Sequence, residues 1–136
     1  MTPLEGQAIL DQMFAPWVQA LRLRVNACDA ASATLVLPFD PSLVRVGGIV
    51  CGQALMSAAD SAMVIAISSA LGGLRPMATA SLNTSFMRPV ANTDVELVAR
   101  VLKLGKSLVF GDIEMRAVGD ERLVGHATTT YALVPG

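Results

Sequence analysis

Apolar side chains near the start of the chain follow a helical spacing. They recur at three- and four-residue intervals from Leu10 to Leu21, as on one face of an amphipathic helix. Pro16 interrupts this pattern, because a proline inside a helix removes a hydrogen bond and clashes with the preceding turn. We therefore expect a helix that ends near residues 13–15 and a short second turn that carries Trp17.

Two short runs with β-strand character follow, at residues 22–28 and 32–38, and a turn-like segment separates them. A loop is then expected at 39–50, where Gly47 and Gly48 form a pair of turn residues.

The segment 52–71 has a different pattern, because small and apolar residues fill nearly every face of a helix drawn through it. A helix that is apolar all round is enclosed by protein, and Gly72 and Gly73 supply a stop signal. Its length would suit a membrane span, but Asp60 lies near its middle and no Lys/Arg cluster flanks it. We therefore expect a buried helix about 30 Å long and no membrane partner.

After Pro76 the side chains alternate with a period of two, which is typical of strands. Four strands are predicted, at 77–87, 95–101, 107–118 and 122–134. The first should have one apolar face, with Ala78 and Leu82, and one hydroxyl-rich face, with Thr79 and Ser81.

The order of these elements predicts the fold class. No repeat, linker or low-complexity stretch divides the chain, so residues 1–136 should form a single domain. Strands connected in succession by short turns form an antiparallel sheet, and the apolar helix needs a cover. We expect an α+β fold in which a curved antiparallel sheet of five to six strands wraps around the long central helix.

Composition narrows the function classes. The chain has 10 Lys and Arg against 11 Asp and Glu, and this balance argues against a nucleic-acid partner. Apolar residues make up 53% and charged residues 15%, which excludes disorder and favours oligomerisation. No signal peptide is visible at the N-terminus, so a cytoplasmic location is expected. Two cysteines and one histidine without metal-type spacing predict no metal site or cofactor.

Asp60 is the first candidate for chemistry. It is flanked by alanines within the apolar helix, and no cationic side chain lies within one turn of it. An ionised carboxylate buried without partners is very costly, so Asp60 must be hydrogen-bonded, protonated or open to a cleft. Such carboxylates cluster at active sites but also occur as structural groups, and the residues leave both roles open.

The glycine-containing run 47–53 leads directly into the helix. Glycines such as Gly48 let a ligand approach the backbone, and N–H groups at a helix start could hold a phosphate or polarise a carbonyl oxygen. A glycine turn that merely begins a helix is equally common.

Cys51 could be a thiolate activated by the helix dipole, but no histidine is near it in sequence, so an apolar role is favoured. A structural role is also favoured for His126.

Basic residues are few, and three of them form a possible set. Arg88 ends the first of the four later strands, and Lys103 and Lys106 flank the turn at Gly105. Surface lysines usually contribute only solubility, but together these residues could hold a phosphorylated carrier.

Three segments resemble a known family. The run GIVCGQALMSAADSA at 48–62 resembles the G-x-x-H-G-G-x(6)-D signature of hotdog-fold acyl-CoA thioesterases of the phenylacetate-pathway, PaaI-like type. The run NTSFMRP at 83–89 and the turn at 101–107 are similar to later motifs of the same family. The resemblance runs from about Ala15 to the C-terminus. It implies a hotdog fold and hydrolysis of an acyl-CoA thioester to a free acid and coenzyme A.

The resemblance also implies roles for particular residues. Asp60 would be the catalytic carboxylate, acting as general base on water or as nucleophile on the thioester carbonyl. The amide of Gly52 would donate to the developing oxyanion, and Thr79 would position the water. Because this family forms its site at a dimer interface, Asp60 and Thr79 are expected to come from different subunits of a homodimer, itself part of a dimer of dimers.

Three residues depart from the family pattern. Cys51 stands where the family has histidine, Gln53 where it has a second glycine, and Arg45 where an asparagine contacts the thioester. With Gly48 and the three basic residues above, they are the expected substrate-binding positions. These departures are expected to change which substrate is bound more than which reaction is catalysed. They also leave open the alternative that the protein is a non-catalytic acyl-CoA binding or sensing module. A hotdog hydratase is disfavoured, because it needs a histidine paired with a carboxylate and the helix and its loop have none.

Overall fold

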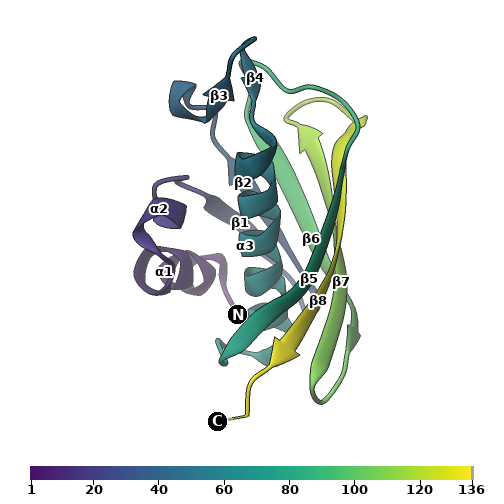
Figure 1. Cartoon of the computed structure of the whole chain (residues 1–136). Helices are drawn as coiled ribbons and strands as arrows, with labels where there is room; N and C mark the ends of the chain where they lie inside the picture. Colours follow the sequence, from purple (N-terminus) through teal and green to yellow (C-terminus); the bar gives the residue numbers. More distant parts are fainter. Residues whose placement is uncertain (136) are drawn as a thin grey trace.

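In the computed structural model, which describes residues 1–135, a curved antiparallel sheet wraps around the long helix α3 (Gly52–Leu71) (Figure 1). The six strands lie in the order β1 (Arg24–Cys28), β2 (Ser32–Leu37), β6 (Val95–Leu104), β7 (Leu108–Ala117), β8 (Leu123–Leu133), β5 (Met77–Phe86). Strand β6 pairs with β2, so the strands that precede α3 and those that follow it form one sheet. The predicted α+β fold, with its helix at 52–71, is confirmed.

The N-terminal segment covers the side of α3 that lies away from β5 to β8 (Figure 1). Helix α1 (Pro3–Met13) ends before Pro16, and Pro16 is the first residue of the short helix α2 (Pro16–Gln19). Because proline lacks a backbone N–H, it suits the first position of a helix but not its interior. The predicted break and second turn are therefore confirmed.

The loop predicted at 39–50 contains short elements that the sequence pattern did not indicate. A 3-10 turn, η1 (Pro41–Leu43), precedes the small hairpin β3 (Val44–Arg45) and β4 (Ile49–Val50). Gly47 and Gly48 form its turn with φ angles of 103° and 80°, a region that residues with a Cβ rarely adopt. This hairpin leads the chain into the first turn of α3.

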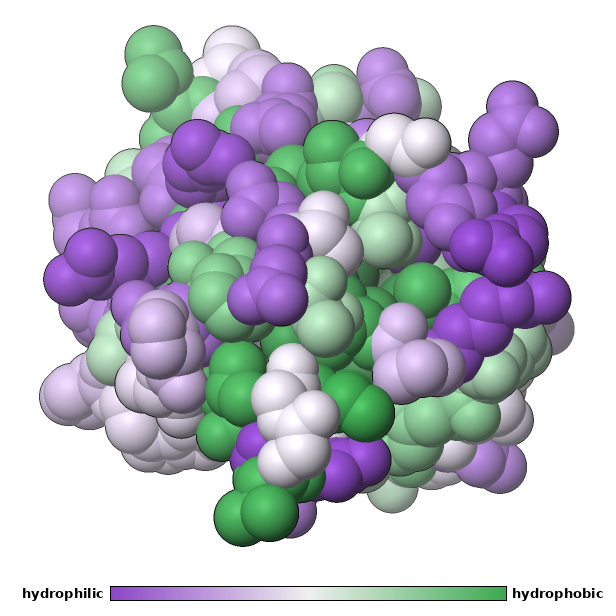
Figure 2. All heavy atoms as spheres, turned by 90° about the horizontal axis from the view of Figure 1, so that it is seen from above, coloured by the Kyte–Doolittle hydropathy of each residue, from purple (hydrophilic) through white to green (hydrophobic). Residues whose placement is uncertain are grey.

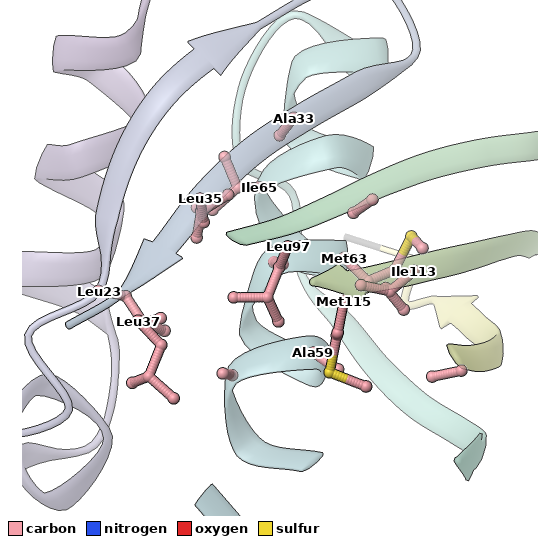
Figure 3. Packing of buried hydrophobic residues seen from close by; sticks show 14 of the residues in the cluster. Leu23, Ala33, Leu35, Leu37, Ala59, Met63, Ile65, Leu97, Ile113 and Met115 are labelled. Carbon is pink, nitrogen blue, oxygen red and sulfur yellow. The ribbon is translucent and has the colours of Figure 1, made fainter. Parts of the chain in front are cut away.

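The core lies between α3 and the concave face of the sheet (Figure 3). Met63 and Ile65 of the helix are fully buried, as are Leu35 and Leu97 of the strands. Helix α3 has the length and apolar composition of a membrane span, but most of it is buried inside the protein. The prediction of a buried helix is confirmed.

One contact between helix and sheet is unusually close. Gly111 of β7 is buried over α3, and a Cβ built at this position would lie 2.7 Å from the Sδ of Met63 and 2.7 Å from the main-chain oxygen of Arg100. The strand can therefore approach the helix only because residue 111 has no side chain.

Strand β5 departs from the predicted alternation at Ala80. In its pairing with β8, Thr79 lies opposite Tyr131 and Leu82 lies opposite Thr129, with a register shift between them. Both partners are buried on the inner side of β8, so β5 faces the helix with Thr79 before the bulge and with Leu82 after it. The prediction of one apolar face for this strand was wrong, because an extra residue exchanges the two faces of a strand.

Candidate active site

Asp60 lies in the middle of α3 and is bound by hydroxyl groups from two strands. The Oγ1 of Thr79 donates to the Oδ1 of Asp60 at 2.9 Å. The hydroxyl of Tyr131 donates to the same Oδ1, and also to the main-chain oxygen of Asp60 at 2.9 Å. These contacts satisfy the requirement that a carboxylate in an apolar helix have hydrogen-bond partners.

The fold explains why these three groups meet within one chain. Tyr131 points inward from β8, and the bulge in β5 directs Thr79 toward the same turn of the helix. The expectation that Asp60 and Thr79 come from different subunits was therefore wrong for this contact. Only residues 72–76 connect α3 to β5, so the strand returns directly past the helix that precedes it.

The Asp60 carboxylate opens into a cavity of about 210 Å³ between α3, α2 and the start of β5. It is lined by Phe14, Trp17, Val18, Ser57, Asp60, Ser61, Val64, Met77, Thr79 and Tyr131. Burial and the negative charge of Asp60 raise the pKa of Tyr131 far above its usual range, so its hydroxyl keeps its proton.

Two further hollows adjoin this cavity along the same side of α3. One, of about 530 Å³, shares Phe14, Val64 and Met77 with it, and is lined mainly by apolar residues. The other, of about 340 Å³, shares Trp17 and Ser57 with it, and reaches Cys51 and Gln53 at the start of the helix. We call the three hollows together the α3 groove. It provides apolar surface on one side of Asp60 and a path to the helix start on the other.

A separate cavity of about 400 Å³ lies at the N-terminus of α3. It is lined by Gly52, Phe86, Arg45 and Arg88 among others, and it opens at the end of the molecule seen in Figure 2, where hydrophobic groups gather between polar ones. Gly52 is the first residue of the helix, so its N–H has no partner within the helix. The free N–H can therefore donate to an oxygen from outside.

Gly52 and Asp60 of one chain cannot contact the same carbonyl group. Eight residues of α-helix separate them, which corresponds to about 12 Å along the axis. The two groups also line different cavities. Any reaction that uses both needs a second copy of the chain.

The other predicted binding residues are divided between the two ends of the sheet. Arg45 and Arg88 lie at the helix start, where Arg45 donates to the main-chain oxygen of Val46 at 2.8 Å. Gly48 lies in the adjacent β3–β4 turn. Lys103 and Lys106 lie near the β6–β7 turn at the opposite end (Figure 1), so one chain does not bring them to Arg45 and Arg88.

Cys51 and His126 do not form a catalytic pair. Cys51 is the N-cap of α3 and borders the α3 groove. His126 lies 3.1 Å from Asp112 on the neighbouring strand β7, consistent with the structural role expected for it. Among residues 1–135 there is also no cluster of side chains suited to a metal ion.

Replacing Cys51 by Ser should stabilise the fold by about 1 kcal/mol, because serine is a preferred N-cap and Cys51 makes no side-chain cap bond. Turnover should fall less than about tenfold, since the thiol has no base beside it. Chemical denaturation and steady-state kinetics measure the two effects. The matched control is Cys28→Ser, which lies in β1 and should give no stabilisation. Complete loss of activity in Cys51→Ser would instead indicate a thiolate nucleophile.

Tyr131 is the site residue that sequence reasoning missed. It is the only tyrosine of the chain, and it falls on the inner side of an alternating strand. A signal was present, because a carboxylate in an apolar helix needs a donor and a lone inward tyrosine can supply one. The pairing of α3 with the last strand was not evident from sequence spacing.

Comparison with known proteins agrees with this geometry. Residues 47–124, which include Gly52, Asp60 and Thr79, match the thioesterase superfamily. A candidate esterase from Thermoplasma volcanium is 34% identical over 104 residues, covering 71% of this chain and 70% of that protein.

Solved structures have the same architecture. A candidate thioesterase from Silicibacter sp. TM1040 matches with a TM-score of 0.88 and 29% identity, over 99% of this chain and 93% of that one. The E. coli PaaI protein from the phenylacetic acid degradation operon has the same fold, with a TM-score of 0.85 and 19% identity over 98% and 93% of the two chains. The chain therefore belongs to the thioesterase superfamily, with the hotdog fold of PaaI.

Proposed function

We propose that this thioester hydrolase acts on acyl-CoA, with Asp60 as its catalytic carboxylate. The observation that carries the proposal is the position of Asp60, held by two hydroxyl groups where a cavity meets an apolar groove. The groove can take an acyl group while the carboxylate faces the thioester carbonyl. No observation on residues 1–135 favours a non-catalytic sensing module over this enzyme.

The chemistry follows from the charge that develops during hydrolysis. Asp60 removes a proton from water as the water oxygen bonds to the carbonyl carbon, or its own oxygen attacks that carbon. Either route places negative charge on the carbonyl oxygen, where a free backbone N–H is a suitable donor. Collapse of this intermediate breaks the C–S bond, and the coenzyme A thiolate leaves and takes up a proton. On the first route this releases the free acid directly; on the second, water then hydrolyses the acyl–Asp60 anhydride to the free acid and regenerates the carboxylate.

Gly52 can be that donor if two copies of the chain assemble. Since Asp60 and Gly52 of one chain are about 12 Å apart, the Gly52 amide would come from the second copy. Strand β5 supports such a dimer, because it is an edge strand of the sheet and most of its residues are exposed. Two β5 edges could pair across a symmetry axis and bring the two helices side by side. We extend the proposal to a homodimer, with Thr79 kept beside Asp60 of its own chain.

The experiment that tests the function is release of free coenzyme A thiol from short, medium, long and aryl acyl-CoAs. Turnover of at least one substrate class is expected. The aryl members are informative because Phe14 and Trp17 both line the Asp60 cavity, although the sequence contains few aromatic residues. An inactive enzyme across the whole panel would contradict the acyl-CoA assignment.

Arg45 and Arg88 are proposed to bind the phosphates of coenzyme A, together with the Gly48 turn. Lys103 and Lys106 lie at the opposite end of the sheet, so they would join these phosphates only from a second copy of the chain. Replacing Arg45 by Gln should raise KM for acyl-CoA by roughly 3- to 10-fold at low salt, with little effect on kcat. Hydrolysis of the matching acyl-N-acetylcysteamine, which has no phosphate, should not change. Arg24→Gln on the distant edge strand β1 is the control for loss of one positive charge. An equal rise in KM for both substrates would rule out phosphate binding by Arg45.

A further inference from the structure

The two oxygens of the Asp60 carboxylate have different surroundings. Oδ1 accepts hydrogen bonds from both Thr79 and Tyr131. In the part of the chain that the structure describes, no donor contacts Oδ2. The carboxylate, which borders the cavity, is therefore asymmetric, with one anchored oxygen and one that no donor contacts.

Tyr131 is a well-fixed anchor. Its side chain is 1% exposed, and its hydroxyl also donates to the main-chain oxygen of Asp60 at 2.9 Å. One hydroxyl thus contacts the backbone and the side chain of the same residue. This arrangement restricts rotation of the carboxylate about its Cβ–Cγ bond more than a bond to the side chain alone would.

We propose that Tyr131 is a positioning residue that assigns Oδ2 of Asp60 as the oxygen that reacts with water or with the thioester carbon. This inference rests on the proposed function, since it gives one residue a role in the reaction of Asp60. The role lies outside the family match at residues 47–124, and neither sequence motif includes Tyr131.

The hydroxyl of Tyr131 also keeps its proton. Burial and the charge of Asp60 raise the pKa of Tyr131, so it remains a donor throughout the working range of pH. Of the residues that line the Asp60 cavity, Tyr131 and Thr79 are the ones that donate to the carboxylate, so the protonated hydroxyl of Tyr131 is a constant part of its surroundings.

The chain contains a matched control on the same strand. Thr129 lies two residues before Tyr131 on the inner side of β8 and is 4% exposed. Its hydroxyl has no hydrogen-bond partner within residues 1–135. Thr129→Val and Tyr131→Phe therefore each remove one buried hydroxyl, but only the second removes a bond to Asp60.

The first test compares Tyr131→Phe, Thr79→Val, Thr129→Val and Asp60→Asn by coenzyme A release across a range of pH. Tyr131→Phe should lower kcat by roughly 10- to 100-fold, as expected for loss of a hydrogen bond to a charged group. KM should stay within about twofold. Thr79→Val should have the same direction of effect, and Thr129→Val should match the wild type.

The second test does not depend on a substitution in the core. Because Tyr131 is the only tyrosine, biosynthetic incorporation of 3-fluorotyrosine labels this site alone. The ¹⁹F resonance of the folded enzyme should shift with pH over the range in which kcat falls on the acid side. The shift should be absent in labelled Asp60→Asn.

The outcomes separate the two proposals. If Asp60→Asn is inactive but Tyr131→Phe keeps the kcat of Thr129→Val, the role of Tyr131 is overturned and the function stands. A ¹⁹F resonance that does not respond to pH also overturns the role of Tyr131. If Asp60→Asn keeps wild-type turnover, Asp60 is not the catalytic carboxylate, and the roles of Asp60 and Tyr131 are both wrong; if the wild type releases no coenzyme A from any substrate, the acyl-CoA assignment is wrong.

Discussion

Replacing Asp60 by Asn should lower kcat for thioester hydrolysis by about 10²- to 10⁴-fold, the range expected for loss of an acid–base group. Asparagine has almost the same shape, and its side-chain oxygen can still accept the hydrogen bonds of Thr79 and Tyr131. The fold and the cavity should therefore persist. What is lost is the charged oxygen that takes a proton from water or attacks the carbonyl carbon.

The measurement is coenzyme A release under saturating substrate, combined with calorimetric binding of a non-hydrolysable thioether analogue of acyl-CoA. Binding should be close to that of the wild type. The control is Asp29→Asn in the β1–β2 turn, where the carboxylate accepts a bond from Ser32 that an amide oxygen can also accept. A loss of turnover in Asp29→Asn, or none in Asp60→Asn, would contradict the assignment.

Replacing Gly111 by Ala should be among the most destabilising single-methyl substitutions in the chain. The new Cβ would lie 2.7 Å from the main-chain oxygen of Arg100 and would collide with the side chain of Met63. Met63 can move, but the backbone of the neighbouring strand cannot move without disturbing the sheet. Overpacking of this kind costs about 1–3 kcal/mol in the free energy of unfolding, which should lower Tm by several degrees.

Thermal unfolding at a fixed protein concentration measures the effect, because association would make Tm depend on concentration. Gly73→Ala is the control, since a Cβ at that position has nothing within 4 Å and its backbone needs no left-handed φ. The two variants should differ clearly in Tm. If they unfold at the same temperature, β7 and α3 are not packed as closely as described.

The elements of the fold could be predicted because the hydrophobic pattern changes period where the structure changes. Helix α3 begins and ends at the residues that the pattern predicts, and the prolines and glycines mark the breaks. The β3–β4 hairpin was not predicted, because strands of two residues are too short to show an alternation. The bulge at Ala80 was not predicted either, since it depends on the pairing of β5 with β8.

Only one residue of the candidate site could be identified from the sequence pattern alone. Asp60 is conspicuous because a carboxylate in an apolar helix needs hydrogen-bond partners or access to a cleft. Thr79 could be named only through the family resemblance, and the chain it belongs to was assigned wrongly. Tyr131 could not be linked to Asp60, because a contact across 71 residues depends on how the sheet curves. The distance between Gly52 and Asp60, in contrast, follows from the helical rise alone.

The bulge in β5 makes the geometry around Asp60 depend on the number of residues in the strand as well as on their identity. Deleting Ala80 would leave Thr79 opposite Tyr131 and Leu82 opposite Thr129 with only Ser81 between them, so both side chains would still face the helix. Deleting a residue outside the bulge, such as Ser85, would instead exchange the faces of the residues beyond it. A scan of point substitutions would not reveal this dependence, whereas a scan of single-residue deletions would. Among homologues, loss of one residue at the bulge would therefore be compatible with the same site, whereas loss of one elsewhere in the strand would mark a change even where Asp60 and Thr79 are both retained.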